Sequence, residues 1–238
     1  MALRDEILTV NLILTRRCNL RCSYCRIIKN YDEYVAPAFQ SAIKTLSDWK
    51  EIISTIYSLN PYVFLIFTGG EVLTAFPFGD FVELVRWLGQ FASSIRPIPY
   101  AFISNSLLLT ESKARKLVEA GLLNWSTSVD SLEEIPFDKD IDKKSHAGLK
   151  WLLWFKEHGV KDLVAIITCT KANYHEAPEI IRRLSNLGIW TEVTVIDQPK
   201  SFFYDFAETV DPSLLFTPDD LPEVKKVFEE CARLKEQG

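Results

Sequence analysis

Near its amino terminus the chain reads Ile7-Leu-Thr-Val-Asn-Leu-Ile-Leu14 and continues at once with Thr15-Arg-Arg-Cys-Asn-Leu-Arg-Cys-Ser-Tyr-Cys25. The first run is mostly apolar and predicts a strand. The second run holds three of the five cysteines of the chain, Cys18, Cys22 and Cys25. Three thiolates on one short loop can hold three corners of a cubane iron–sulfur cluster. The fourth iron then lacks a protein ligand, and an open metal position is typical of a site that performs chemistry.

The rest of the chain alternates between short runs rich in Val, Ile, Phe and Tyr and longer amphipathic stretches. The predicted strands are residues 7–14, 62–67, 99–103, 125–129, 162–168 and 190–196. The predicted helices are residues 41–59, 79–93, 111–120, 145–158, 174–187 and 219–236. Strict alternation implies a parallel sheet with right-handed crossovers. Six strands are too few for a closed eight-stranded barrel, so we expect an α/β fold, a partial (β/α)6 three-quarter barrel with outer helices.

Composition limits the class of protein. A chain of 238 residues that is 47% hydrophobic can bury a sizeable core, and we expect residues 1–238 to form one domain. The net charge is −5 and the basic residues are scattered, which argues against a nucleic-acid surface. No signal peptide and no apolar run long enough for a bilayer is present in the sequence, so it predicts a cytoplasmic protein without a membrane partner.

Polar residues follow the predicted strands at their carboxyl ends. Gly69-Gly70-Glu71 comes after the second strand and Ser104-Asn105 after the third, while Ser128 lies near the end of the fourth strand and Asp130 directly after it. In a parallel barrel these ends share one rim with the cysteine loop, and that rim carries the chemistry. Two glycines permit close backbone approach to a ligand. A carboxylate directly behind them can accept hydrogen bonds from an ammonium group.

These motifs together resemble those of the radical S-adenosylmethionine (SAM) enzymes. The C-x3-C-x-(aromatic)-C loop of that family matches Cys18, Cys22, Tyr24 and Cys25. Its Gly-Gly-Glu motif matches residues 69–71, at the expected place after the second strand. The resemblance extends from about the first predicted strand to the sixth.

The resemblance implies two cofactors, a [4Fe–4S] cluster on the three cysteines and SAM chelated to the fourth iron. It places Glu71 at the SAM amino group, with Gly69 and Gly70 lining the methionine moiety. The other implied contacts are Ser104, Asn105 and Ser128 at the ribose or carboxylate, and Tyr24 near the adenine. Asp130 is a further candidate, either as a SAM contact or as a cap or ion-pair partner at the rim.

The implied reaction begins with one electron entering the sulfonium of SAM, from a donor such as flavodoxin or ferredoxin. It yields methionine and a 5′-deoxyadenosyl radical, which takes a hydrogen atom from a peptide or small-molecule substrate. The cofactor carries this chemistry, while the protein supplies orientation and a dry site.

The chain departs from the family pattern at two backbone-shaping positions. Val72 stands where many members have proline, and Ser106 replaces a glycine after Asn105. In style the chain is similar to the branch of molybdenum-cofactor cyclases and SPASM-type peptide-modifying enzymes. Activating enzymes of glycyl-radical proteins remain an alternative, but their usual Asp-x-Lys element on strand four does not match residues 129–131.

Only two cysteines lie outside the loop, and they cannot supply a second cubane. Either the enzyme works without auxiliary clusters, or a cysteine-rich C-terminal extension is missing. Cys169 ends the fifth predicted strand. We expect it to project near the radical, as a hydrogen donor to a product radical or as a small buried hydrophobe. Cys231 is expected to fill the core.

Simpler interpretations exist for each feature. The three cysteines could bind zinc with a fourth ligand from elsewhere, or a structural cluster, in a scaffold module without catalysis. Ser104, Asn105 and Ser128 could cap the helices that follow them. Arg16 and Arg17 could offset the negative charge of a thiolate-bound cluster, or only be solvated.

Overall fold

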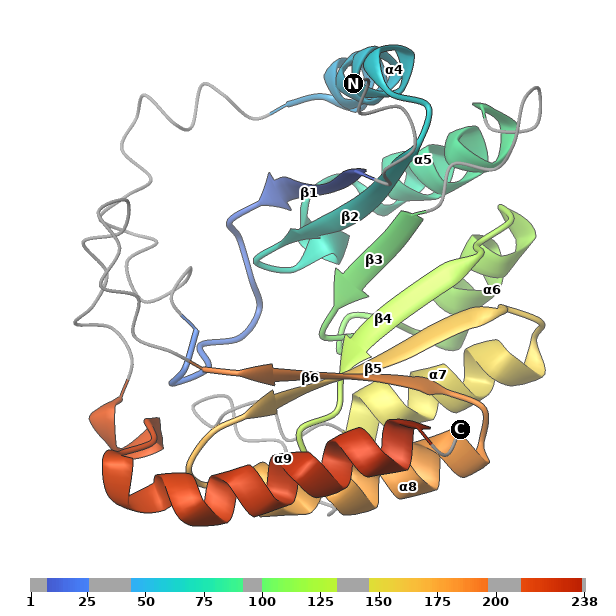
Figure 1. Cartoon of the computed structure of the whole chain (residues 1–238). Helices are drawn as coiled ribbons and strands as arrows, with labels where there is room; N and C mark the ends of the chain where they lie inside the picture. Colours follow the sequence, from blue (N-terminus) through green and yellow to red (C-terminus); the bar gives the residue numbers. More distant parts are fainter. Residues whose placement is uncertain (1–7, 26–43, 92–99, 132–145, 197–210, 237–238) are drawn as a thin grey trace.

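The computed structural model describes residues 8–25, 44–91, 100–131, 146–196 and 211–236 (Figure 1). The described strands form a single six-stranded sheet in the order β1-β2-β3-β4-β5-β6. Their bounds are β1 (Leu8–Thr15), β2 (Val63–Gly69), β3 (Tyr100–Ser104), β4 (Asn124–Ser128), β5 (Asp162–Cys169) and β6 (Trp190–Val195). All five neighbouring pairs are parallel. The sequence order of the strands is therefore their spatial order, as right-handed β/α units require.

Helices connect the strands and cover the outside of the curled sheet, so the predicted α/β partial barrel is confirmed (Figure 1). The α-helices are α4 (Leu46–Leu59), α5 (Phe78–Phe91), α6 (Glu111–Glu119), α7 (His146–Glu157), α8 (Ala177–Asn186) and α9 (Leu221–Glu236). Short 3-10 turns are η2 (Val72–Thr74), η3 (Tyr174–Glu176), η4 (Pro212–Leu214) and η5 (Pro218–Asp220). α9 lies along α8 in the outer layer (Figure 1).

Local sequence explains where two helices begin. Thr45 and Asp48 form a capping box, in which each side chain accepts a hydrogen bond from the backbone of the other residue, and this sets the start of α4. The predicted helix over 174–187 starts with the 3-10 turn η3, and α8 itself begins at Ala177 with Pro178 in its first turn. Proline is favoured there because the first amides of a helix lack partners.

The core lies between the sheet and the outer helices, and aromatic rings from neighbouring strands fill it. Phe67 of β2 stacks on Phe102 of β3 with ring centroids 4.8 Å apart. Trp125 of β4 continues the row to Phe155 of α7, at 5.4 Å. These rings are fully buried. Burying such rings contributes strongly to stability, so these residues must face the helices. Because side chains alternate along a strand, the residues between them then point to the concave face of the sheet.

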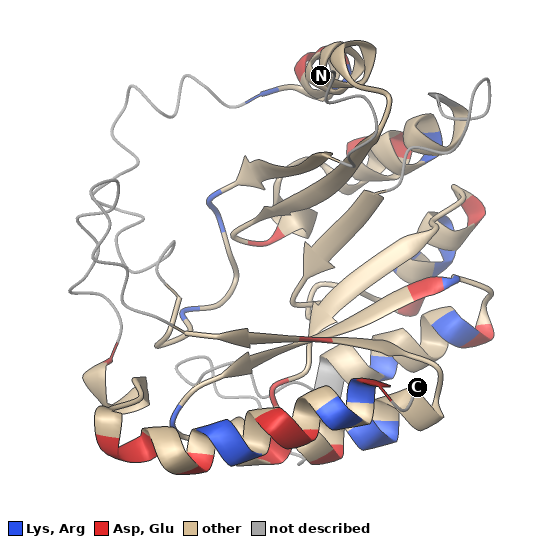
Figure 2. Ribbon diagram, viewed as in Figure 1, with Lys and Arg blue, Asp and Glu red and all other residues tan. Residues whose placement is uncertain are grey.

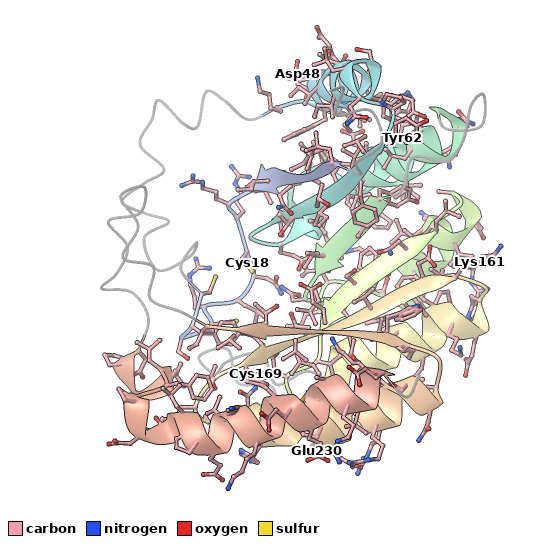
Figure 3. The ribbon with its side chains drawn as sticks, viewed as in Figure 1. Cys18, Asp48, Tyr62, Lys161, Cys169 and Glu230 are labelled. Atoms are coloured by element: carbon pink, nitrogen blue, oxygen red, sulfur yellow. The ribbon has the colours of Figure 1, made fainter. Side chains whose placement is uncertain are left out.

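The carboxyl ends of the strands all lie on one side of the molecule. The chain after β1, which carries the cysteines, runs along these ends from β1 toward β5 and β6 (Figure 1). Cys18 lies on this side, whereas Lys161, just before β5, lies at the opposite end of the sheet (Figure 3). The fold therefore brings the cysteine loop to the rim that the sequence predicts.

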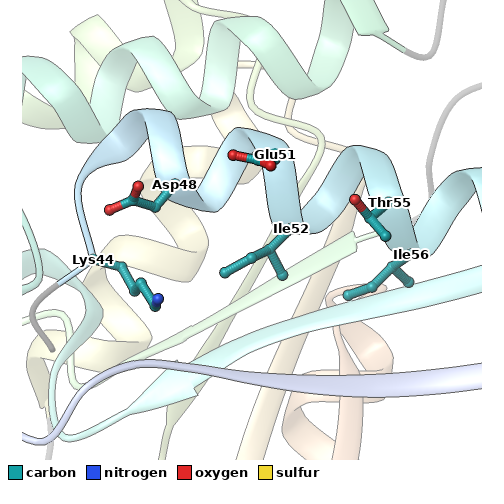
Figure 4. A pocket seen from close by; sticks show the side chains of 6 residues that line it. All are labelled: Lys44, Asp48, Glu51, Ile52, Thr55 and Ile56. Carbon is teal, nitrogen blue, oxygen red and sulfur yellow. The ribbon is translucent and has the colours of Figure 1, made fainter.

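The surface away from this rim carries charges of both signs. Lysines, arginines and carboxylates intermix along α8 and α9 (Figure 2). One shallow hollow lies along α4 (Figure 4), lined by Lys44, Asp48, Glu51, Ile52, Thr55 and Ile56. None of these is a predicted site residue. No helix in the described part of the chain is long and apolar enough to cross a membrane.

Candidate functional site

The cysteine loop is held by hydrogen bonds between its own residues and by one buried side chain. Leu20 is buried and anchors the loop, and the Cys25 amide donates to the Cys22 carbonyl at 3.0 Å. The guanidinium of Arg21 donates to the carbonyls of Cys18 and Leu20 at 3.1 and 3.0 Å. Cys22 is buried, while Cys18 and Cys25 are half-buried. The loop is thus ordered enough to present thiols and open enough to admit a cluster.

The donor set fits an iron–sulfur cluster. Three thiols from one loop are the usual ligand type, and the Cys18 sulfur already accepts hydrogen bonds, from the Leu20 amide at 3.4 Å and from the Asn105 side chain at 3.7 Å. Such donors suit an anionic thiolate. Within the described ranges no three Cys, His, Asp or Glu side chains are gathered closely enough to hold a metal ion. Convergence of the three sulfurs would therefore accompany cluster binding.

The paired glycines lie directly against the backbone that leads into the cysteine loop. Gly70 donates its amide to the Thr15 carbonyl, and Glu71 donates its own to the Arg17 carbonyl, both at 2.7 Å. A Cβ on Gly69 would lie 2.1 Å from the Thr15 oxygen, and one on Gly70 only 2.2 Å from the Arg17 oxygen. Gly69 also has φ +137°. The close approach expected at these glycines is therefore, in this structure, an approach to the protein's own backbone.

The Glu71 carboxylate points into the protein and is fully buried. Its Oε1 accepts from the Leu73 amide at 3.0 Å and from the Ser104 hydroxyl at 2.7 Å. Its Oε2 accepts from the Asn105 amide at 2.7 Å. Three donors of this kind are what a buried carboxylate needs to offset its desolvation. Glu71 thereby joins the β2 and β3 rim loops, and its predicted contact with the SAM amino group stays a prediction.

Ser106 takes the backbone conformation that a glycine at this position would take. It adopts φ 62°, the left-handed conformation that glycine takes readily. Its buried hydroxyl accepts from the Trp125 indole at 3.0 Å and donates to the Thr127 hydroxyl at 2.8 Å. These bonds offset the steric cost of the conformation. Val72 is the first residue of η2, a position where proline is favoured because the first amides of a helix lack partners. The turn forms with valine in this place.

Substitutions at Ser106 should separate the two effects. Ser106→Ala leaves the Trp125 and Thr127 side chains without their partner and keeps the left-handed backbone, so it should lower the free energy of unfolding by about 1–3 kcal/mol. Ser106→Gly loses the same hydroxyl but relieves about 1 kcal/mol of backbone cost. Urea titration should therefore rank wild type above Ser106→Gly and Ser106→Gly above Ser106→Ala. Equal stability of the two variants would contradict this account.

Tyr24 and Asp130 tie the cysteine loop to the far side of the rim. The Tyr24 hydroxyl donates to Asp130 Oδ2 at 2.8 Å, and Asp130 Oδ1 accepts from the Thr168 amide at 2.8 Å. Burial, with the Asp130 carboxylate close by, holds the pKa of Tyr24 well above its usual value of 10.0. Tyr24 therefore stays protonated and donating. The two residues predicted near SAM act, in this structure, on each other.

Removing the Tyr24 hydroxyl should loosen the cysteine loop. A hydrogen bond to a carboxylate is worth about 1.5–3 kcal/mol, so Tyr24→Phe should speed amide hydrogen exchange in residues 18–25 by roughly tenfold to a hundredfold. The matched control is Tyr62→Phe, because the Tyr62 ring is exposed beyond α4. Mass spectrometry of peptic fragments measures both. Unchanged exchange in the loop of Tyr24→Phe would show that Asp130 does not hold it.

Ser104, Asn105 and Ser128 are all buried at the rim. The Ser104 hydroxyl and the Asn105 backbone amide donate to the Glu71 carboxylate, and neither residue caps the following helix, α6, because Thr110 does so. Ser128 lies on the concave face of β4, opposite the core residues Trp125 and Val129. Period-two alternation along the strand sets this orientation.

Cys169 does not project toward the concave face, so this expectation was wrong. It is fully buried in the core cluster together with Leu163, Ala165 and Ile167, the other members of its face of β5. Figure 3 places it on the side where α9 lies, and Cys231 of α9 is in the same cluster. Burial raises the pKa of its thiol to about 12. The role of a small buried hydrophobe, expected also for Cys231, fits these surroundings.

Two asparagines at the site were missed in the sequence. Asn173 donates to the carbonyls of Asp130 and Thr168 at 3.1 and 3.0 Å, and accepts from the Thr170 amide at 2.7 Å. Asn19 accepts from the Asn105 side chain at 2.8 Å. A polar residue just after a strand was the available signal for Asn173, but it stands directly before the predicted helix. Asn19 gave no signal beyond its place in the loop.

A parallel partial barrel with a three-cysteine loop against a Gly-Gly-Glu loop at its carboxyl rim defines a class of cluster-dependent SAM enzymes. The sequence model of the radical SAM superfamily matches residues 12–193. This is more than half of the chain, and the chain belongs to the radical SAM superfamily. Members of the superfamily use a [4Fe–4S] cluster and SAM.

Individual relatives agree with this assignment. The PqqA peptide cyclase of Bradyrhizobium diazoefficiens is 26% identical over 96% of this chain and 56% of its own length. The GTP 3′,8-cyclase of Microcystis aeruginosa is 32% identical over 60% of this chain and 40% of its own. The chain spans about half the length of the curated relatives it matches.

Solved structures share the fold. Streptococcus suis SuiB bound to SAM superposes with a TM-score of 0.68 and 16% identity, covering 96% of this chain and 48% of SuiB. SuiB bound to its precursor peptide SuiA gives 0.67. At this identity the likeness concerns the fold alone.

Proposed function

We propose that this chain binds a [4Fe–4S] cluster through Cys18, Cys22 and Cys25 and cleaves SAM reductively to start hydrogen abstraction from a substrate. The observation that carries the proposal is the joining of the cysteine loop to the Gly-Gly-Glu loop through two 2.7 Å backbone hydrogen bonds. Because those bonds hold the Gly-Gly-Glu loop against the backbone that leads into the cysteines, a ligand at the cysteines would also lie beside the glycines. When bound, the cluster and SAM supply a 5′-deoxyadenosyl radical and methionine.

The residues around the cysteines would have two kinds of role. The half-exposed backbone of Gly69 and Gly70 and the concave-face hydroxyl of Ser128 are placed to contact SAM. Glu71 and Asp130 are buried and accept hydrogen bonds from neighbouring rim segments, so both would also keep the rim in one arrangement, which limits reorganisation during the reaction. We keep Glu71 as the residue proposed to contact the SAM amino group, and Asp130 as a further candidate contact.

We propose a peptide as the substrate class. The support is a relative that aligns with 96% of this chain and is named for its peptide, PqqA peptide cyclase, and the fold likeness to SuiB, which was crystallised with a precursor peptide. A small-molecule substrate is the alternative, because other relatives are named GTP 3′,8-cyclase. We also propose that residues 1–238 form one core domain.

Calorimetry with SAM separates this proposal from a cluster-binding scaffold without catalysis. The chain, loaded anaerobically with iron and sulfide, should bind SAM with a stoichiometry near one, and the unloaded chain should bind it at least tenfold more weakly. The loss is expected because the open iron supplies part of the SAM site. A loaded chain that gives no heat with SAM would favour the scaffold.

An acidic electron donor, such as flavodoxin or ferredoxin, is the proposed protein partner. Arg16 and Arg17 directly precede Cys18, Arg21 lies between Cys18 and Cys22, and all three are exposed. Opposite charge on a donor would steer its encounter with this rim. Arg16→Glu should slow flavodoxin-driven SAM cleavage several-fold at low salt and leave dithionite-driven cleavage unchanged. Equal loss with both reductants would contradict a docking role.

A further inference from the structure

The Asn105 side chain crosses from the end of β3 to the cysteine loop. Its Nδ2 donates to the Asn19 Oδ1 at 2.8 Å and to the Cys18 sulfur at 3.7 Å. Its Oδ1 accepts from the Leu107 amide at 3.0 Å. The two amide protons and one side of the carbonyl oxygen are therefore engaged within the protein. This arrangement points toward Cys18 rather than toward a ligand.

The side chain is held in this position from behind. Its own backbone amide donates to Glu71 Oε2, and Ser104, which precedes it, donates to Glu71 Oε1. Ser106, which follows it, donates its amide to the Ser104 hydroxyl at 2.9 Å. Asn105 itself is only 2% exposed. A side chain supported by a buried carboxylate and a closed network keeps its geometry when the cysteine loop moves.

A hydrogen bond to a thiolate ligand has a known electrostatic consequence. The donor stabilises negative charge on the sulfur, and a reduced cluster carries one more negative charge than an oxidised one. Hydrogen bonds to cluster sulfurs are therefore one of the means by which a protein sets the reduction potential. Asn105 is placed to do this at Cys18.

We infer that Asn105 is a positioning residue that holds the cysteine loop through Asn19 and raises the reduction potential of the cluster through its hydrogen bond to the Cys18 sulfur. The inference rests on the proposed function, because it requires Cys18 to be a cluster ligand. It differs from a role as a SAM contact, for which the amide would have to leave both of its present acceptors.

Two variants of the full chain test the inference. Asn105→Ala removes both donors, and Asn105→Asp keeps the shape and the acceptor for Leu107 while replacing the donors with a negative charge. Each is loaded anaerobically with iron and sulfide, and its midpoint potential is measured without SAM by a redox titration followed by electron paramagnetic resonance. Asn105→Ala should disfavour reduction by about tenfold, which is about 59 mV for one electron. Asn105→Asp should disfavour it further.

The matched control is Asn186→Asp. It makes the same change from asparagine to aspartate at an exposed position, at the end of α8 and outside the cysteine loop. Solvent screens a charge at such a position, so the equilibrium constant for reduction of the cluster should change by less than twofold in this control. A purely structural role for Asn105 would lower the iron content without moving the potential of the clusters that form.

The outcomes are distinct. Lower potentials in both Asn105 variants, with the control unchanged, support the inference. If either variant folds by circular dichroism and holds its cluster at the wild-type potential, Asn105 does not tune it. If a variant folds but holds no cluster, the positioning part is supported, and the other variant decides the tuning part. If the wild-type chain itself holds no cluster, the proposed function fails first.

Discussion

Replacing Cys22 with alanine should abolish cluster binding and, with it, all cleavage of SAM. Two thiols from one loop cannot hold a cubane that needs three, and the described residues contain no other group of three Cys, His, Asp or Glu side chains that could hold a metal. Iron analysis after anaerobic loading should fall from about four per chain to near zero. The fold should persist, because losing one buried sulfur costs only about 1 kcal/mol.

Cys231→Ala is the control for this variant. Cys231 is as buried as Cys22, at 4% against 3% exposure, but it lies in α9, in the core cluster. It should lose the same small packing energy and retain full iron content. If Cys22→Ala still loaded four irons, the cysteine loop would not be the cluster site.

Replacing Gly70 with alanine should separate the two halves of the site. The added Cβ would lie 2.2 Å from the Arg17 oxygen and 2.7 Å from the Arg16 oxygen, and both of these atoms belong to backbone that cannot rotate away. The segments must move apart, which breaks the bonds from Gly70 to Thr15 and from Glu71 to Arg17. We expect a loss of roughly 3 kcal/mol in the free energy of unfolding, with weak iron loading.

Gly89→Ala is the matched control within the same chain. Gly89 lies inside α5, and apart from its chain neighbours and its own helix backbone a Cβ there would meet no atom within 4 Å. Alanine is the better helix former, so this variant should gain about 0.5–1 kcal/mol and load iron normally. Urea denaturation measures both variants. Similar stability for Gly70→Ala and wild type would mean that the two loops can separate at little cost.

Much of the fold follows from patterns that act locally. Alternation of β-branched runs with amphipathic stretches predicted all six strands, and each observed strand lies within about two residues of its prediction. The cysteine spacing and the Gly-Gly-Glu run predicted which rim would carry the site. These signals survive because period-two and helical repeats are properties of short segments.

The site's inner connections could not be predicted in the same way, because they depend on contacts distant in sequence. Whether Glu71 faces a ligand or the protein depends on Ser104 and Asn105, which are more than thirty residues away. Whether Cys169 faces the concave side depends on the register of β5, where one residue changes the face. Whether serine could replace glycine at position 106 depends on hydrogen bonds to Trp125 and Thr127, which are distant in sequence.

The most direct test of the central claim is the formation of 5′-deoxyadenosine from SAM by the anaerobically loaded chain with dithionite as reductant. We predict 5′-deoxyadenosine and methionine in equal amounts, and none without reductant or with Cys22→Ala. The loaded Cys231→Ala variant should match wild type. A chain with a complete cluster that binds SAM but forms no 5′-deoxyadenosine under these conditions would contradict the account.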